Sequence, residues 1–467
     1  MVCYTAALTW GLAAGGYTMS SADLNDLGSA RARLQELAAD ALARAAAGGA
    51  SAAEVAASLA GGLSVTVRKG EVETLEHQRD RGFSVTVYFG RRKGSASSSD
   101  LAPAAIRETV DKACTIARYT AEDPCAGLPD PERMAREPPD LDLDHPWEID
   151  ADRAVVLARE CEAAGLEADE RISNTEGGSL STHRSLRVYA NTHGFSNGYA
   201  STSHSISCAL IGGRGEGMQR DYWYTMARRA EDLESPEAVG RRAAERTLRR
   251  LGARRLSTRA VPVIFVPELA RGFIGHLLAA IKGGAQYRKA SFLLGAAGQR
   301  VLPEWMNIDE RPHLPRAPGS APFDAEGVAT QDRALVESGV LGGYVLSSYS
   351  ARRLGLQTTG NAGGVHNLLV STGPRDLDGL IRDMGRGLVV TELMGHGVNG
   401  VTGDYSRGAS GFWVEGGEIS HPVQEVTIAG NLKDLLLDIQ AVGSDVDRRG
   451  VIQTGSLLLG RMTVAGD

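Results

Sequence analysis

A chain of 467 residues is long enough for two or three domains, and its 42% hydrophobic content is typical of a globular protein with large cores. A net charge of −7, without segregated basic runs, argues against nucleic acid or an anionic membrane as a partner. Five cysteines without a C-x-x-C pair favour a reducing, cytoplasmic compartment. No run of 18 apolar residues is present that could span a membrane.

The N-terminal half begins with residues 1–22, which we expect to be an extension without fixed structure. Met1 and Met19 are the two candidate start residues for translation. Ala, Leu and Arg at helical spacing then predict a helix over about 24–60. Alternating Val, Thr, Tyr and Phe with Gly at the turns predict strands at 63–70, 71–80 and 82–100. A helix is expected next, with Asp100 near its cap and Pro103 in its first turn.

A second segment of similar order follows, with a helix at 150–164, strand-like stretches within 179–230 and another helix. Asp-Leu followed by Pro recurs at 100–106 and 232–239, which predicts an internal α/β duplication. We interpret the arginine-rich stretch at 241–255 as a solvated helix face. The predicted N-terminal α/β domain therefore covers 23–255 and a second domain covers 256–467.

The second domain is predicted to be mostly antiparallel β, as a sandwich or a partly closed barrel, so that the fold class is α+β. Short strands punctuated by Gly and Pro predict hairpins over 321–355, and "EGGE" predicts a two-residue turn between two strands. Apart from the helix that begins near 266, a single helix is predicted, at 431–443.

The helix within 266–284 carries two apolar stripes and one histidine, His276. A metallopeptidase helix of the H-E-x-x-H type needs a second histidine four residues away, but 272 is Gly and 280 is Ala. Alone, His276 is more typical of a core histidine than of a metal ligand. The other histidines of the two domains show no ligand spacing.

The richest polar stretch is 391–417, where side chains that can bind a ligand are interspersed with glycines: His396, Asn399, Asp404, Tyr405 and Arg407. Two interpretations remain open for it. Asp404 and Arg407 could pair locally to hold a turn, or the stretch could face a ligand, since glycines allow a peptide backbone to approach closely.

Several long motifs in this chain resemble the TldD/PmbA family, specifically its PmbA (TldE) branch. They are "ELARGFIGHLLAAIKGGAQYRKASFL", "PFDAEGV", "SSYSARRLGLQTTGNAGGVHN", "MGRGLVVTELMGHGVNGVTGDYSRGASGFWVEGGEI" and "VTIAGNLKD", together with a looser match in 65–101. The resemblance implies an α/β domain, a mostly β domain and a cytoplasmic metallopeptidase assembled from TldD-like and PmbA-like subunits. Such an assembly trims peptides, including precursors of modified peptides.

In the TldD branch the helix carries a metal-binding H-E-x-x-x-H, and a Cys ligand follows later in the chain. Placed on this sequence, the motif puts Arg271 at the first His, Gly272 at the Glu and His276 at the second His, and no Cys follows residue 208. The resemblance thus implies a degenerate metal site, with no metal ligand, catalytic residue or cofactor in this chain. Zn or Fe is expected in the TldD-like partner instead.

We therefore expect a non-catalytic subunit that closes the substrate chamber around the partner's metal and holds extended peptide. Besides the five residues named in 391–417, the predicted contacts with substrate or partner are Tyr287, Arg288 and Lys289. The alternatives are a self-sufficient homodimeric metallopeptidase and a stand-alone peptide-binding protein of a natural-product pathway.

Overall fold

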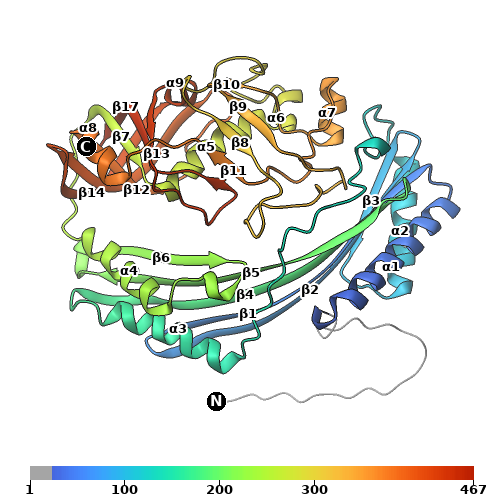
Figure 1. Cartoon of the computed structure of the whole chain (residues 1–467), viewed down its shortest axis with the longest axis horizontal. Helices are drawn as coiled ribbons and strands as arrows, with labels where there is room; N and C mark the ends of the chain where they lie inside the picture. The colour runs from blue at the N-terminus through green and yellow to red at the C-terminus, as the bar shows by residue number, and fades with distance from the viewer. Residues whose placement is uncertain (1–23, 467) are drawn as a thin grey trace.

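The N-terminal domain consists of two units of the same order, helix, three strands, helix (Figure 1). In the computed structural model, which describes residues 24–466, the first unit contains α1 (Leu27–Ala47), β1 (Ala52–Arg68), β2 (Glu71–Phe89), β3 (Arg92–Ser98) and α2 (Pro103–Tyr119). The second contains α3 (Ala151–Leu166), β4 (Ile172–Asn191), β5 (Ser196–Gly212), β6 (Gln219–Ala227) and α4 (Pro236–Arg249). The repetition confirms the predicted duplication. The extension predicted at 1–22 lies outside the described residues.

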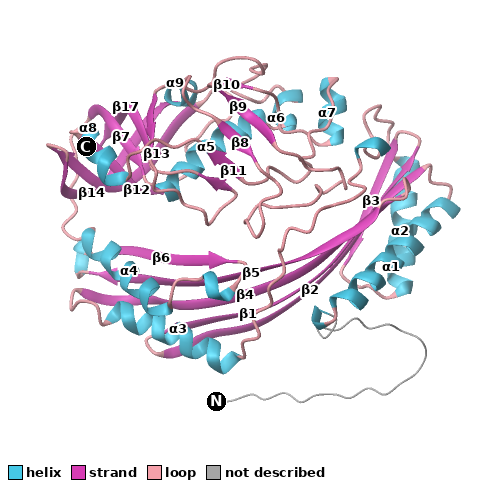
Figure 2. Cartoon of the chain, in the orientation of Figure 1, coloured by secondary structure: helices cyan, strands magenta, loops and turns pink. Residues whose placement is uncertain are grey.

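All six strands of this domain form one antiparallel sheet in the order β3-β2-β1-β4-β5-β6. The two units meet at its centre, where β1 pairs with β4, so that Val55 lies between Val85 and Ala190. The strands are long and curved, and the helices cover one face of the sheet (Figure 2). Alternate residues of β1 are buried, because every second side chain points to that helical face.

The C-terminal domain contains strands of 2 to 14 residues, several of them joined by long loops. Its elements are β7 (Arg259–Phe265), α5 (Pro267–Ile281), α6 (Gly283–Tyr287), β8 (Ile308–Glu310), β9 (Arg333–Glu337), β10 (Val340–Leu341), α7 (Ser348–Leu354), β11 (Leu368–Val370), α8 (Leu377–Met384), β12 (Gly387–Met394), β13 (Asp404–Glu415), β14 (Glu418–Asn431), α9 (Leu432–Leu437), β15 (Ile439–Val442), β16 (Ile452–Gln453) and β17 (Leu457–Ala465). The predicted boundary at 255/256 falls between α4 and β7.

Five strands of this domain close into a barrel, β14-β13-β12-β7-β17, because β14 also pairs with β17. Within the described barrel only the β12–β7 pair is parallel, and in the second sheet β11–β16 is parallel too, so the domain is mostly antiparallel and barrel-like, as predicted. The "EGGE" turn joins β13 to β14 as predicted. A second sheet has the order β10-β9-β8-β11-β16.

Helix α5 lies in a core that the barrel and the second sheet share. Phe273, Leu277 and Ile281 belong to one cluster with barrel residues such as Phe265 and sheet residues such as Leu368. Both predicted apolar stripes are buried except at Leu269, which is only partly buried. The core on either side therefore fixes the position and rotation of this helix.

Three predictions of local structure were wrong. Residues 52–60 form the start of β1 rather than a helix, because β2 and β4 pair with them on both sides and override the helix preference of alanine. Residues 348–354 form α7, whose start is held by a capping box between Ser347 and Ser350, rather than a hairpin. The predicted single helix at 431–443 is six residues of α9 followed by β15, and α6, α7 and α8 were not predicted.

No helix within residues 24–466 is long and apolar enough to cross a membrane.

Candidate functional site

Arg271 lies on α5 and its guanidinium is fixed by contacts with both domains. It donates hydrogen bonds to the Glu268 carbonyl oxygen at 3.1 Å and to the Tyr224 hydroxyl at 3.0 Å. Its Nη1 lies 3.4 Å from a carboxylate oxygen of Asp447. Tyr224 belongs to β6 and Asp447 to the loop before β16, so Arg271 ties the N-terminal sheet to the C-terminal domain.

Gly272 is exposed, and a Cβ atom built on it would meet no other heavy atom within 4 Å. Its φ is not in the left-handed region that favours glycine, so neither space nor backbone conformation requires glycine here. The position presents no carboxylate, and so no general base, to a neighbouring group.

His276, one turn further along α5, is half-buried and contacts Tyr405 of β13 with the two ring planes almost perpendicular and their centroids 5.8 Å apart. Burial lowers the pKa of His276, and the nearby positive charge of Arg407 lowers it further. The imidazole is therefore neutral at pH 7. Its described surroundings supply an aromatic ring and a cation, whereas a metal site would need further ligands.

A metal ion of the kind that the TldD motif binds does not fit these residues. Between residues 24 and 466, no three His, Cys, Asp or Glu side chains come together as a set that could hold a metal ion. Arg271 brings a fixed positive charge to the position of the first ligand, and Asp447 beside it already pairs with Arg449 at 2.9 Å. That these positions correspond to the metal motif stays a prediction from the resemblance.

A network of ion pairs surrounds the start of α5 and joins the two domains. Arg449 lies 2.9 Å from Asp447 and 3.7 Å from Glu268, while Arg246 of α4 lies 3.2 Å from Glu268 and 3.3 Å from Asp221 of β6. The Arg449 guanidinium also sits 4.2 Å from the centre of the Trp223 ring. Arginine suits such a position, because its planar group can bind carboxylates and stack on aromatic rings at once.

The arginine-rich stretch of α4 contributes more to this network than its sequence predicted. The side chains of Arg246 and Arg250 are only 20% and 9% exposed. Arg250 pairs with Asp221 of its own domain and with Glu392 of β12 in the other. The interpretation of 241–255 as a solvated face was therefore wrong for these two residues.

The two segments predicted to contact substrate or partner, 286–292 and 391–417, lie next to each other. The backbone N–H of Phe292 donates a hydrogen bond of 2.9 Å to the carbonyl oxygen of Gly400. In the first segment, Arg288 and Lys289 are exposed and Tyr287 stacks edge-on against Tyr349. The prediction that this surface binds substrate or partner stays a prediction.

Within 391–417, His396, Asn399 and Asp404 are exposed, whereas Tyr405 is 2% exposed and packs in the core beside His276. As a core residue, Tyr405 is not open to a ligand. No ion pair joins Asp404 to Arg407 in the described chain. The carboxylate of Asp404 instead accepts hydrogen bonds from the side chains of Thr402 and Asn431. The local pair considered from the sequence is thus not what holds this turn.

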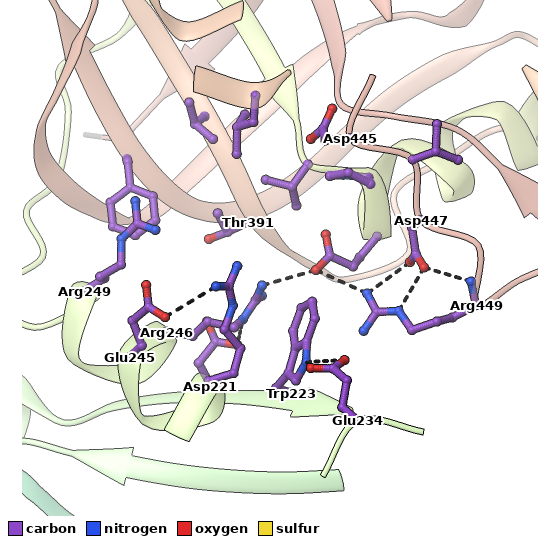
Figure 3. Close-up of a pocket in the computed structure, with 18 of the residues that line it drawn as sticks. Asp221, Trp223, Glu234, Glu245, Arg246, Arg249, Thr391, Asp445, Asp447 and Arg449 are labelled. Atoms are coloured by element: carbon purple, nitrogen blue, oxygen red, sulfur yellow. Dashed lines mark hydrogen bonds and ion pairs between the residues drawn. The ribbon is translucent and has the colours of Figure 1, made fainter. Parts of the chain in front are cut away.

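A cavity of about 470 Å³ lies between the two domains, beside the ion-pair network (Figure 3). Strand β6 and helix α4 form one wall, and the start of α5, strands β12 and β13 and the loop at 445–449 form the other. The sequence did not predict this cavity, because its walls come from separate segments spread over residues 221–449.

Comparison with known proteins places the chain in a family. Sequence models of the PmbA/TldA metallopeptidase match it in three parts: domain 1 at 53–117, the central domain at 144–251 and the C-terminal domain at 258–466. Metalloprotease PmbA of Escherichia coli O157:H7 is 52% identical over 414 residues, covering 89% of this chain and 92% of that protein. The PmbA homologue of Haemophilus influenzae is 50% identical over 418 residues, with the same two shares covered.

Solved structures show the same fold. A crystal structure from Bacteroides thetaiotaomicron is 29% identical and superposes with a TM-score of 0.88, covering 93% of this chain and 99% of that one. TldE of Thermococcus kodakarensis, at 22% identity, superposes with a TM-score of 0.82 over 92% of this chain and all of that one. On the identity and coverage of these relatives, this chain belongs to the PmbA/TldE family of metallopeptidases.

Proposed function

We propose that this chain is the non-catalytic subunit of a metallopeptidase complex, and that a TldD-like partner supplies the metal. The observation that supports the proposal is the contact of the Arg271 guanidinium with Tyr224 and Asp447, at the residue where the resemblance predicts the first metal ligand. A cation fixed in that place repels a metal ion, and Gly272 leaves the motif without its general base.

The partner would hold Zn or Fe, and the complex would degrade or trim peptides such as modified-peptide precursors or leader peptides. This chain would shape the substrate chamber. The exposed residues of 286–292 and 391–417 are suited to such a role, because the two segments lie next to each other. We place the complex in the cytoplasm, which agrees with the free thiols of Cys114, Cys125, Cys161 and Cys208.

Co-purification from the native host tests the proposal most directly. A tagged copy of this chain should bring down a homologue that carries H-E-x-x-x-H and a later Cys, and only the complex should contain near-stoichiometric Zn or Fe by elemental analysis. The complex should cleave an unstructured peptide that the isolated chain leaves intact.

Two results would decide for the alternatives. Near-stoichiometric metal in the isolated chain, with peptidase activity that is lost in His276→Ala, would establish a self-sufficient metallopeptidase. Failure to recover any metal-binding homologue, together with peptide binding by the isolated chain, would establish a stand-alone peptide-binding protein.

A further inference from the structure

Basic side chains gather on the surface where α6 and α7 pack side by side (Figure 1). Tyr287, the last residue of α6, contacts the ring of Tyr349 on α7, with the ring centroids 5.9 Å apart. The guanidinium of Arg288 lies 5.3 Å from the centre of the Tyr287 ring, and that of Arg353 on α7 lies 5.2 Å from the same centre. Two arginines from different helices thus converge on one ring. With the neighbouring Lys289, they form what we call the α6–α7 patch.

The arginine that follows α6 is held by more than the ring. Arg288 donates a hydrogen bond of 3.2 Å from Nη1 to the Tyr287 hydroxyl. A Cβ atom built on Gly284 would come within 3.2 Å of Nη2 of Arg288, so the guanidinium also lies against the backbone of α6. A side chain that is already held in place loses less conformational freedom when it binds a ligand. Arg288 is therefore prepared to bind a further group.

The α6–α7 patch carries a surplus of positive charge. Arg288, Lys289 and Arg353 are exposed, and none of them forms an ion pair with a carboxylate of residues 24–466. Asp123 is the acidic residue beside the patch, and it accepts a hydrogen bond of 2.7 Å from the Tyr349 hydroxyl. That hydrogen bond lowers the pKa of Asp123, and the charge of Arg353 lowers it further, so this carboxylate is ionised at pH 7. One negative charge beside three positive ones leaves the patch cationic.

The number of cations favours a short acidic segment over a nucleic acid. Proteins that bind nucleic acid through its backbone make about 6–10 phosphate contacts, more than three side chains can supply. The net charge of −7 would also repel a long polyanion wherever it extended beyond the patch. Two or three carboxylates match the patch in number, and a guanidinium can bind a carboxylate through two parallel hydrogen bonds.

We propose that the α6–α7 patch binds an acidic segment of an extended peptide, with the carboxylates of two or three Asp or Glu side chains on Arg288, Arg353 and Lys289. The inference rests on the proposed function in taking a peptide as the ligand. It adds the kind of substrate, which is an unfolded peptide with clustered acidic residues.

Fluorescence anisotropy with dansyl-Gly-Glu-Gly-Glu-Gly-Glu-Gly-amide tests the patch on the isolated full-length chain. Alternate residues of an extended peptide point to the same side, so its three Glu side chains can reach one surface. This peptide should bind saturably, and the same peptide with Gln in place of each Glu should bind at least about tenfold more weakly, because it lacks the charge that strengthens these hydrogen bonds. Raising the salt concentration from about 50 mM to about 500 mM should also weaken binding of the Glu peptide, because exposed charges are screened.

Variants assign the effect to named residues. Arg288→Gln and Arg353→Gln should each weaken binding of the Glu peptide at least about threefold and leave binding of the Gln peptide unchanged. Arg241→Gln serves as the matched control, because Arg241 is an exposed arginine of α4 in the other domain, and it should bind as the wild type does. The double variant Arg288→Glu with Arg353→Glu should bind a peptide with Lys in place of each Glu more tightly than the Glu peptide. Such a reversal of preference cannot result from misfolding.

The proposal is overturned if the Glu and Gln peptides bind equally, if the Glu peptide does not bind up to millimolar concentration, or if the double variant keeps the preference of the wild type. It is also overturned if a thymidine tetranucleotide displaces the labelled peptide at concentrations at which the unlabelled Glu peptide does not, since the patch would then prefer nucleic acid. Discrimination between the Glu and Gln peptides without a metal-binding partner in the pull-down would reject the proposed function alone. Recovery of that partner without discrimination would reject this inference alone.

Discussion

Arg449 joins the two domains through several contacts, and replacing it should destabilise the protein more than replacing the arginine beside it. Its guanidinium pairs with Asp447, donates a hydrogen bond of 2.7 Å to the Tyr224 carbonyl oxygen and stacks over Trp223. The side chains of Arg449 and Asp447 are only 15% and 5% exposed. Arg448 is exposed and has no ion pair among the described residues.

The expected magnitude follows from burial. Removing one member of a buried ion pair destabilises by about 3–5 kcal/mol, because the remaining charge stays buried without its partner. In Arg449→Gln, Asp447 keeps a second cation, Arg271, at 3.4 Å. The expected loss in the free energy of unfolding is therefore about 3 kcal/mol, the lower end of that range. Arg448→Gln should change the free energy of unfolding by less than about 0.5 kcal/mol, as is usual for exposed side chains.

Urea unfolding followed by far-ultraviolet circular dichroism measures both variants, and a double-mutant cycle with Asp447→Asn isolates the pair. The coupling free energy between Arg449 and Asp447 should be about 1–3 kcal/mol, the range for charged groups in direct contact. Additive effects within about 0.5 kcal/mol, or equal losses in Arg448→Gln and Arg449→Gln, would refute the assignment of Arg449 and Asp447 as a stabilising buried ion pair.

Three further predictions concern single residues. Gly272→Ala should raise the free energy of unfolding by about 0.5–1 kcal/mol, because alanine favours a helix and its Cβ would meet no other heavy atom within 4 Å. Gly240→Ala should instead lower the melting temperature, because its Cβ would lie 2.0 Å from the carbonyl oxygen of Cys161, where α4 packs on α3. Burial, and then the charge of Glu326, raises the pKa of Asp324 to about 7, so the folded state holds a proton that the unfolded state releases. As the pH rises from about 4 to about 7, the free energy of unfolding should therefore fall by up to about 4 kcal/mol. Urea titrations at several pH values should find this slope absent in Asp324→Asn. Because the pKa of His276 is lowered, the unfolded state binds a proton more readily, and acidification from pH 7 to pH 5 should destabilise the wild type more than His276→Gln in the same titrations.

The features that the sequence predicted correctly are those with local causes. Pro103 begins α2, as its place in the first turn predicts, α3 covers most of the predicted 150–164, and the two glycines at 416–417 form the turn between β13 and β14. The 3.6-residue periodicity of α5 also predicted which of its faces is buried, because that core surrounds most of the helix.

The features it missed depend on partners distant in the chain. The start of β1 is rich in alanine and resembles a helix, and only pairing with β2 and β4 makes it a strand. Arg246 resembles any arginine on a solvated helix until Asp221 and Glu268 come beside it. The cavity could not be predicted for the same reason, since Thr391 and Arg249 lie on different domains.

The resemblance predicts that Arg271 and Gly272 stand where the TldD branch has residues of its metal motif, so a metal site here would need more than one substitution. Replacing Arg271 by His would remove the hydrogen bond to Tyr224 and one of the two cations beside Asp447, while Arg449 would keep that carboxylate engaged. The new imidazole would have a neutral His276 further along the helix, but no Glu at 272 and no cysteine in the C-terminal domain. Arg271 contributes to the contact between domains, so Arg271→His alone would weaken the fold without creating a metal site.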